Sequence, residues 1–311
     1  MNTLFSLVSE PFAYPFMQRA IVAAIITGVV CAVLSCYLVL KGWSLMGDAI
    51  SHAVLPGIVL AFWLGIPLVI GAFVSGIFCA VATGYLKEHS RVKEDTVMGI
   101  VFSGMFAFGL VMFSRIDTDQ HLSHILFGNM LGISLAELKQ TLWIAGFTLL
   151  VVLLKRKDFM LYCFDPNHAR VIGLPVKLLH YGLLCLLALT IVASLQAVGV
   201  ILVIAMLIAP GIIAFMVCRS FDRMLIVATL VSVVACVLGT LISFHIDGAT
   251  GPCIVIIQAL FFVVALIYSH VKPVQGRQIV PQAKMIVPQA KLIVPQAKDD
   301  SAKNAPKGNL L

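Results

Sequence analysis

Charged residues are scarce in this sequence. Only 11% of the 311 residues are Asp, Glu, Lys or Arg, whereas 61% are hydrophobic and the mean hydropathy is +1.06. A soluble globular domain carries roughly 25% charged residues, so this chain has less than half the polar surface that such a domain needs. The composition therefore excludes a water-soluble domain and predicts a protein embedded in a lipid bilayer.

Three motifs that would indicate chemistry are also missing. The eight cysteines form no C-x-x-C pair, so neither a disulfide framework nor a zinc ribbon is indicated. No H-E-x-x-H sequence is present, which leaves little support for an intramembrane metalloenzyme. The phosphate loop G-x-x-x-x-G-K-[ST] is absent as well. We therefore expect no enzymatic activity and no permanently bound cofactor, and we expect any ATP hydrolysis that drives this chain to reside in a partner chain.

Long apolar stretches predict about nine transmembrane helices. Each stretch is close to the roughly 20 residues that a helix needs to cross the hydrocarbon core of a bilayer. The predicted spans are 18–40, 44–63, 66–86, 95–114, 139–155, 177–195, 198–218, 223–243 and 252–270. The sequence thus predicts an all-α, polytopic membrane helical bundle over residues 1–271.

The distribution of basic residues predicts the orientation of this bundle, because basic residues concentrate in cytoplasmic loops. If the chain starts outside, thirteen basic residues fall inside and three outside. The inside set is Lys41, Lys87, Arg91, Lys93, Lys155, Arg156, Lys157, Arg170, Lys177, Arg219, Arg223, Lys272 and Arg277, and the outside set is Arg19, Arg115 and Lys139. We therefore predict an outside N-terminus and a cytoplasmic C-terminus, and we assign the net charge of +7 to topology rather than to nucleic acid.

The segment between the fourth and fifth spans is too polar to cross. Treating it as a span would move the basic 155–177 loop to the outside. We predict instead a short helix over 121–133 at the outer mouth. His121 and His124 share one face of this helix. Two interpretations are open: outer-gate residues that meet an incoming ion, or ordinary solvated side chains.

The tail after residue 271 differs in kind from the rest of the chain. The sequence Ile-Val-Pro-Gln-Ala-Lys occurs three times with a period of seven. A proline in every repeat prevents a continuous helix, so we predict that 272–311 is a disordered cytoplasmic tail. Two interpretations of this tail are open: weak contact with anionic lipid, or no function.

Asp48 stands out because ionisable residues are rare within the spans. A carboxylate at the centre of a membrane helix costs about 2.5–3.5 kcal/mol on insertion scales, and such residues usually face a bundle interior or a water-filled path. His52 follows four positions later, so both side chains lie on one helix face. One oxygen and one imidazole donor suit Mn(II), Fe(II) or Zn(II). Two ligands are too few, so a second copy or another segment must complete a metal site; a hydrogen-bonded pair that only orders the helices is the alternative.

The longest inside loop carries the signals of a short helix. Asp165 and Pro166 suit its first turn, with the acidic residue at the positive end of the helix dipole. Gly173 provides a stop and Pro175 prevents continuation. A short helix between two spans would present a knob to a cytoplasmic partner; an ordinary connector is the alternative.

Three segments of the chain resemble the permease subunits of bacterial ABC importers for manganese, zinc and chelated iron, most closely the manganese and iron branch. They are 44–57, which contains Asp48 and His52, 127–133, and 169–175. The resemblance covers roughly residues 12–270, and the heptad tail lies outside it. It implies a type II ABC importer-like fold in a bacterial inner membrane, a homodimer around a central pathway, two ATPase subunits and an outer metal-binding protein.

The resemblance also implies roles for individual residues. Asp48 and His52 would touch the metal in transit, and the 164–175 segment would hold a coupling helix that sits in a groove of the ATPase. The residues placed in that coupling segment are Asp165, Ala169, Arg170, Gly173, Leu174 and Pro175. An ion-coupled secondary transporter is the competing prediction, but it needs several buried titratable groups, and the spans hold a single prominent carboxylate.

Overall fold

The computed structural model describes residues 11–43, 45–92, 94–115 and 130–271. Within these ranges nine helices are long and apolar enough to cross a membrane, as the sequence predicts, and no strand occurs in them. The outer helix at 121–133 is described only from Met130 to Gly132, a 3-10 turn labelled η2. His121, His124 and the repeat tail lie outside the described residues, so their predicted roles stay predictions.

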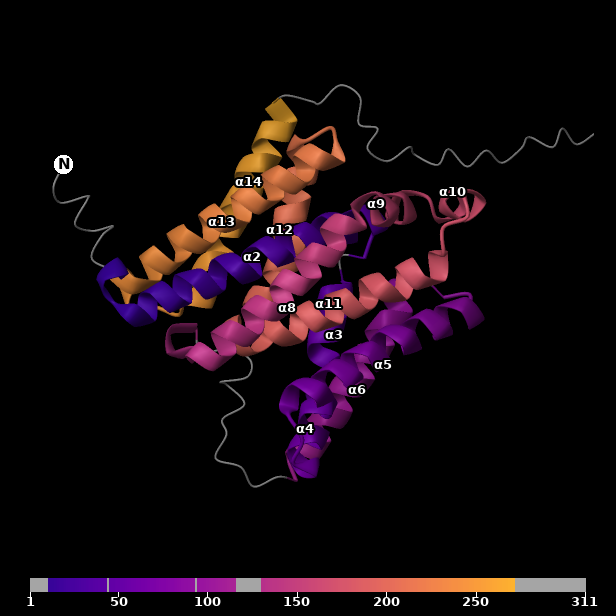
Figure 1. Cartoon of the computed structure of the whole chain (residues 1–311), viewed down its shortest axis with the longest axis horizontal. Coiled ribbons are helices and arrows are strands. Elements are labelled where there is room, and N and C mark those ends of the chain that lie inside the picture. Colours follow the sequence, from indigo (N-terminus) through magenta and orange to yellow (C-terminus); the bar gives the residue numbers. More distant parts are fainter. Residues whose placement is uncertain (1–10, 44, 93, 116–129, 272–311) are drawn as a thin grey trace, which may run out of the picture. The chain divides into compact units, whose positions relative to one another are not determined.

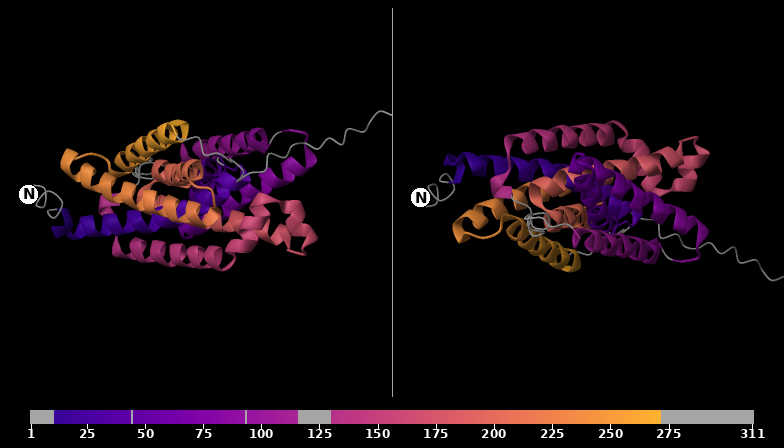
Figure 2. Two further views of the ribbon diagram at one scale, coloured as in Figure 1. Left: turned by 90° about the horizontal axis from the view of Figure 1, so that it is seen from above. Right: turned by 90° about the horizontal axis from the view of Figure 1, so that it is seen from below.

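The nine spans follow one another along the chain with short connections. They are α2 (Pro15–Lys41), α3 with α4 (Met46–Ala53 and Leu55–Leu64), α5 (Leu68–His89), α6 (Glu94–Phe113), α8 (Leu135–Leu154), α11 (Val176–Val198), α12 (Val200–Val217), α13 (Phe221–Ile246) and α14 (Thr250–Val271). Four shorter helices of the described residues lie outside the spans: η1 (Pro11–Ala13), η2 (Met130–Gly132), α9 (Arg156–Phe164) and α10 (Pro166–Val171). The long helices run roughly side by side (Figures 1 and 2).

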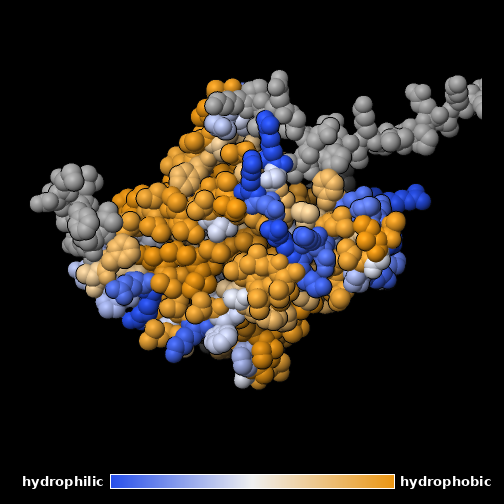
Figure 3. Space-filling model, turned by 45° about the horizontal axis from the view of Figure 1, so that its top comes forward, coloured by the Kyte–Doolittle hydropathy of each residue, from blue (hydrophilic) through white to orange (hydrophobic). Residues whose placement is uncertain are grey.

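The outer surface of the bundle is apolar, as a bilayer requires. Trp143 and Leu154 on α8 are 79% and 74% exposed, and Ile100 on α6 is 70% exposed. Figure 3 shows apolar side chains over most of the visible face, while hydrophilic side chains gather mainly toward the side where Figure 1 places α9 and α10. Such a surface is stable in lipid and would aggregate in water.

Helix α2 forms the centre of the bundle and contacts α12 and α13 along its length. Small residues allow these close approaches, as is usual between membrane helices. A side chain at Gly28 would meet the Ser232 hydroxyl and the Cys236 thiol, each at 2.8 Å, and these two groups donate to backbone carbonyls of α2. Packing of small polar and apolar side chains therefore holds the core together.

The second span is broken at Val54, between α3 and α4. Pro56 has no N–H, so it cannot donate to the carbonyl of His52, and its ring disfavours a straight helix. Ser75 on α5 donates to the neighbouring carbonyl of Ala53 at 2.6 Å, which compensates the broken ladder. This break separates helix α3 from α4, the rest of the same span (Figure 1).

Candidate functional site

Helix α3 lies deep within the bundle, against α5, α6, α11 and α12. A Cβ at Gly47 would lie 3.0 Å from the Leu207 side chain, near the middle of α12. Ile50 approaches Gly76 on α5, where a Cβ would lie 3.2 Å from the isoleucine methyl group. Leu207 and Gly76 lie near the middle of α12 and of α5. Helix α3, with Asp48, therefore lies level with the middle of these two spans.

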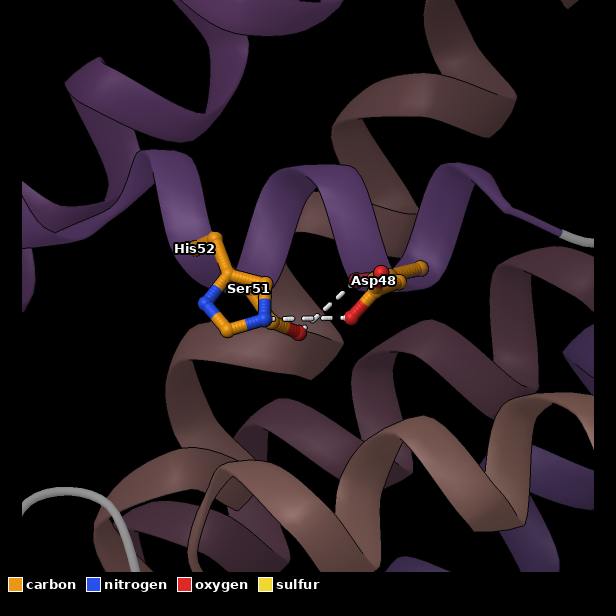
Figure 4. A network of polar contacts seen from close by, with 4 residues as sticks. Asp48, Ser51 and His52 are labelled. Carbon is orange, nitrogen blue, oxygen red and sulfur yellow. Dashed lines mark hydrogen bonds and ion pairs between the residues drawn. The ribbon is translucent and has the colours of Figure 1, made fainter. Parts of the chain in front are cut away.

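Asp48 and His52 form an ion-pair contact on one face of α3, as their spacing predicts. His52 Nε2 lies 3.2 Å from Asp48 Oδ1, and both side chains point the same way (Figure 4). The side chains are 29% exposed for His52 and 32% for Asp48, whereas most of the other α3 residues are buried. The structure therefore places this polar pair on the one open face of an otherwise buried helix.

The surroundings of the pair are aromatic on one side. The His52 ring stacks on Phe102 with centroids 6.1 Å apart and meets Phe106 edge-on at 5.1 Å, both on α6. Ser51 is not free to join the pair, because the residue is only 4% exposed and its hydroxyl donates to Gly47 O at 2.7 Å. Phe102 and Phe106 orient the imidazole ring, and its Nε2 is directed at Asp48.

The described residues hold no group of three or more His, Cys, Asp or Glu side chains that could bind a metal ion. Asp48 and His52 together supply one oxygen and one nitrogen donor. Most protein metal sites for first-row ions use more ligands than this. Further donors must come from outside this described set of side chains.

The predicted short helix of the inside loop is present as α10, and its capping follows the sequence. The Asp165 side chain accepts hydrogen bonds from the N–H groups of Asn167 and His168, at 2.9 and 3.0 Å. Pro166 occupies the first turn. Gly173 ends the turn with φ +90°, a conformation that side-chain-bearing residues rarely adopt.

The side chains of this segment divide into two groups. Ala169 is fully buried and Leu174 is half-buried, so they hold α10 against the bundle. Arg170 is exposed, and Val171 and Ile172 are 86% and 58% exposed. Val171 and Ile172 are not among the residues predicted from the sequence for this segment. The signal that could have identified them is an apolar pair in a polar, basic loop.

Comparison with known proteins identifies the family to which this fold and these segments belong. The model of the family described as the ABC 3 transport family matches residues 13–269. This chain belongs to the ABC-3 transport family. It is therefore a multi-pass membrane permease of a bacterial ABC transport family, which confirms the resemblance found in the sequence.

Curated relatives of this ABC-3 permease include proteins named for iron and for manganese. It is 93% identical over 281 residues to the chelated iron transport system membrane protein YfeD of Yersinia pestis, covering 90% of this chain and 95% of the relative. It is 55% identical over 258 residues to the manganese transport system membrane protein MntB of Synechocystis sp., covering 83% and 84% of the two chains.

Solved structures support the same assignment. PsaBC from Streptococcus pneumoniae in complex with Fab aligns with a TM-score of 0.77 and 36% identity, over 85% of this ABC-3 permease and 95% of that chain. An inward-facing metal-chelate type ABC transporter aligns with a TM-score of 0.66 over 81% and 86% of the two chains. Its identity is only 16%, so this second likeness supports the fold alone.

Proposed function

We propose that this chain is the permease subunit of an ABC importer that carries Mn(II) or Fe(II) into the cytoplasm. ATP hydrolysis on a separate subunit drives the transport. The observation that carries the proposal is the Asp48–His52 pair, held 3.2 Å apart on the open face of a helix that is otherwise buried at mid-bundle depth. The names of the relatives, which cite chelated iron and manganese, support this choice of cargo.

The energetics of the pair favour a transport role over a structural one. A carboxylate at this depth is costly in a bilayer, and a pair that only ordered helices would be expected to point into the core. Both side chains here are about one-third exposed instead. A carboxylate and an imidazole bind divalent first-row metals less strongly than thiolates do. Weaker binding suits an ion that must be released during transport.

A second copy of the chain supplies the missing ligands in this proposal. Two copies related by a two-fold axis beside α3 would bring two carboxylates and two imidazoles to one place. The central path then runs between the protomers, with Asp48 and His52 from each side. The charge distribution supports a path that leads from outside to the end that carries α10.

Helix α10 is the contact with the ATPase in this proposal. Its cap and its Gly173 stop give it a defined shape, and the exposed Val171 and Ile172 give it an apolar tip. Arg170 adds a charge beside that tip. An apolar pair with a charged rim is typical of the centre of a protein–protein interface.

Substitution of the pair tests the proposal directly. In cells that depend on this permease, Asp48→Ala and His52→Ala should each abolish uptake of radiolabelled Mn(II) and Fe(II) while insertion and ATPase association stay normal. Matched controls are Asp247→Asn and His245→Ala, because both residues are exposed at the far end of α13. Unchanged uptake by both Asp48→Ala and His52→Ala would rule out the metal role.

The requirement for ATP separates this function from ion-coupled secondary transport. The assembled complex in proteoliposomes should accumulate metal only when ATP is present with the ATPase. Metal uptake by the permease alone, driven by a proton gradient, would establish the secondary transporter instead.

A further inference from the structure

Four side chains join α9 to the connector that leads into α3. The Tyr162 hydroxyl on α9 and His180 Nδ1 on α11 share a hydrogen bond of 2.8 Å. The His180 ring meets the Trp43 ring edge-on with centroids 5.2 Å apart. Lys41 Nζ lies 4.2 Å from the centre of the Tyr162 ring and 5.8 Å from that of Trp43. We call Lys41, Trp43, Tyr162 and His180 the inner joint.

The inner joint bears directly on the start of α3. Trp43 is 4% exposed, and its N–H donates to Leu38 O at the end of α2. Its carbonyl accepts from the N–H of Met46, the first residue of α3, at 3.1 Å. Trp43 therefore anchors the first turn of α3, and Asp48 follows within that turn.

On its other side, α9 is continuous with α10. The N–H of Asp165, which caps α10, donates to Leu161 O of α9 at 2.9 Å. Helices α9 and α10 also pack against each other. A force on α10 is therefore transmitted to α9 without a flexible linker between them.

The remaining faces of α9 rest on the rigid part of the bundle. Phe159 meets Tyr37 of α2 edge-on at 6.2 Å, and Tyr37 meets Phe221 of α13 at 5.0 Å. Arg156 forms an ion pair of 3.2 Å with Asp222. These contacts hold α9 against α2 and α13, and the inner joint connects it toward α3.

We propose that Tyr162 and His180 are the coupling residues of this permease, which transmit movement of α10 through Trp43 to the Asp48–His52 pair. The proposal rests on the proposed function and adds the route by which ATP hydrolysis reaches the metal site. In this proposal Tyr162 and His180 act on the metal site through Trp43, so they are positioning residues. Burial raises the pKa of Tyr162, so its hydroxyl keeps its proton at neutral pH and can donate to the imidazole.

The test removes the hydrogen bond while it keeps the rings. Tyr162→Phe retains the packing and the cation contact with Lys41, and His180→Phe retains a ring against Trp43. The complex of permease and ATPase is reconstituted in proteoliposomes, and metal transported is measured per ATP hydrolysed. Each variant should lower this ratio roughly fivefold, the factor that corresponds to loss of one hydrogen bond of about 1 kcal/mol. Tyr181→Phe, an exposed neighbour, should leave the ratio unchanged.

The double variant makes the test specific to this bond. If both residues act through it, Tyr162→Phe with His180→Phe should lower the ratio no further than either single change. A ratio equal to that of the unsubstituted complex would overturn the proposal. So would a parallel loss of uptake, ATPase rate and thermal stability, because that pattern reports a purely structural role.

The outcome is separable from that of the proposed function. Asp48→Ala should abolish uptake whatever the inner joint does. If Asp48→Ala abolishes uptake and the inner-joint variants keep the ratio, only the coupling route is wrong. If Asp48→Ala transports normally, the metal role itself fails.

Discussion

Gly57 of α4 and Gly71 of α5 pack backbone against backbone. A Cβ built on either glycine would collide with the carbonyl oxygen of the other. The contact lies directly after the break at Val54, where α4 turns away from α3. Close approach of small residues is the usual way in which membrane helices gain contact area. This pair therefore holds α4, the second part of the broken span, against α5.

Gly57→Ala should therefore destabilise the protein although alanine favours helices in general. The added methyl group meets backbone, which cannot move aside as a flexible side chain can, and overpacking of this kind costs about 1–3 kcal/mol. Thermal unfolding of the purified permease in detergent measures the effect. The control is Gly146→Ala on α8, where nothing lies within 4 Å and the stability should hold or rise.

The Ser35 hydroxyl of α2 forms hydrogen bonds with backbone groups of α12 beside Pro210. Pro210 interrupts the α12 hydrogen bonds, and the Ser35 hydroxyl accepts from Gly211 N–H at 3.0 Å and donates to Ile208 O at 3.2 Å. Ser35→Ala should cost about 1–3 kcal/mol, because it removes both hydrogen bonds that the buried hydroxyl makes with the α12 backbone. Thr190→Ala is the control, since that hydroxyl only bonds within its own helix. Equal midpoints for the two variants in thermal unfolding would contradict the assignment.

The apolar tip of α10 should determine the affinity for the ATPase. Val171→Ser combined with Ile172→Ser removes two exposed apolar side chains. If they are buried in the complex, the affinity should fall tenfold or more, since about 1.4 kcal/mol corresponds to a factor of ten. Co-purification with the tagged ATPase measures this. Leu178→Ser, at a 70% exposed position on α11, should not alter the association.

The Asp165 cap should stabilise α10 both through its negative charge and through its two hydrogen bonds. Asp165→Ala removes the acceptor for two backbone N–H groups and should destabilise the helix by about 1 kcal/mol, whereas Asp165→Asn keeps an acceptor and should cost less. Faster hydrogen exchange at the amides of Asn167 and His168 in the alanine variant is the expected readout. If both variants exchange alike and at the unsubstituted rate, the cap does not stabilise α10.

Much of the fold follows from local features of the sequence. The lengths of the apolar runs place all nine spans, because the thickness of the hydrocarbon core sets the length of a spanning helix. The Asp165 and Pro166 signals mark the start of α10, and the Gly173 signal marks its end. These predictions succeed because a proline, a cap or a positive φ acts within a few residues.

Helix α9 was not predicted, and the reason is instructive. It follows α8 directly after Lys155 and begins with charged residues, so in sequence it looks like the end of a span and a loop. Its buried residues Phe159 and Tyr162 find their partners on α2 and α11, at Tyr37 and His180. No local pattern contains these contacts.

The sequence by itself determined that this chain spans a membrane and that Asp48 and His52 share a helix face. Only the tertiary structure decided that this face is open, that Ala169 is buried while Val171 is exposed, and that Tyr162 meets His180. The physical reason is that lipid and protein interior are both apolar. Hydrophobicity therefore marks where a helix crosses, but the side that faces a neighbour depends on packing with the other helices.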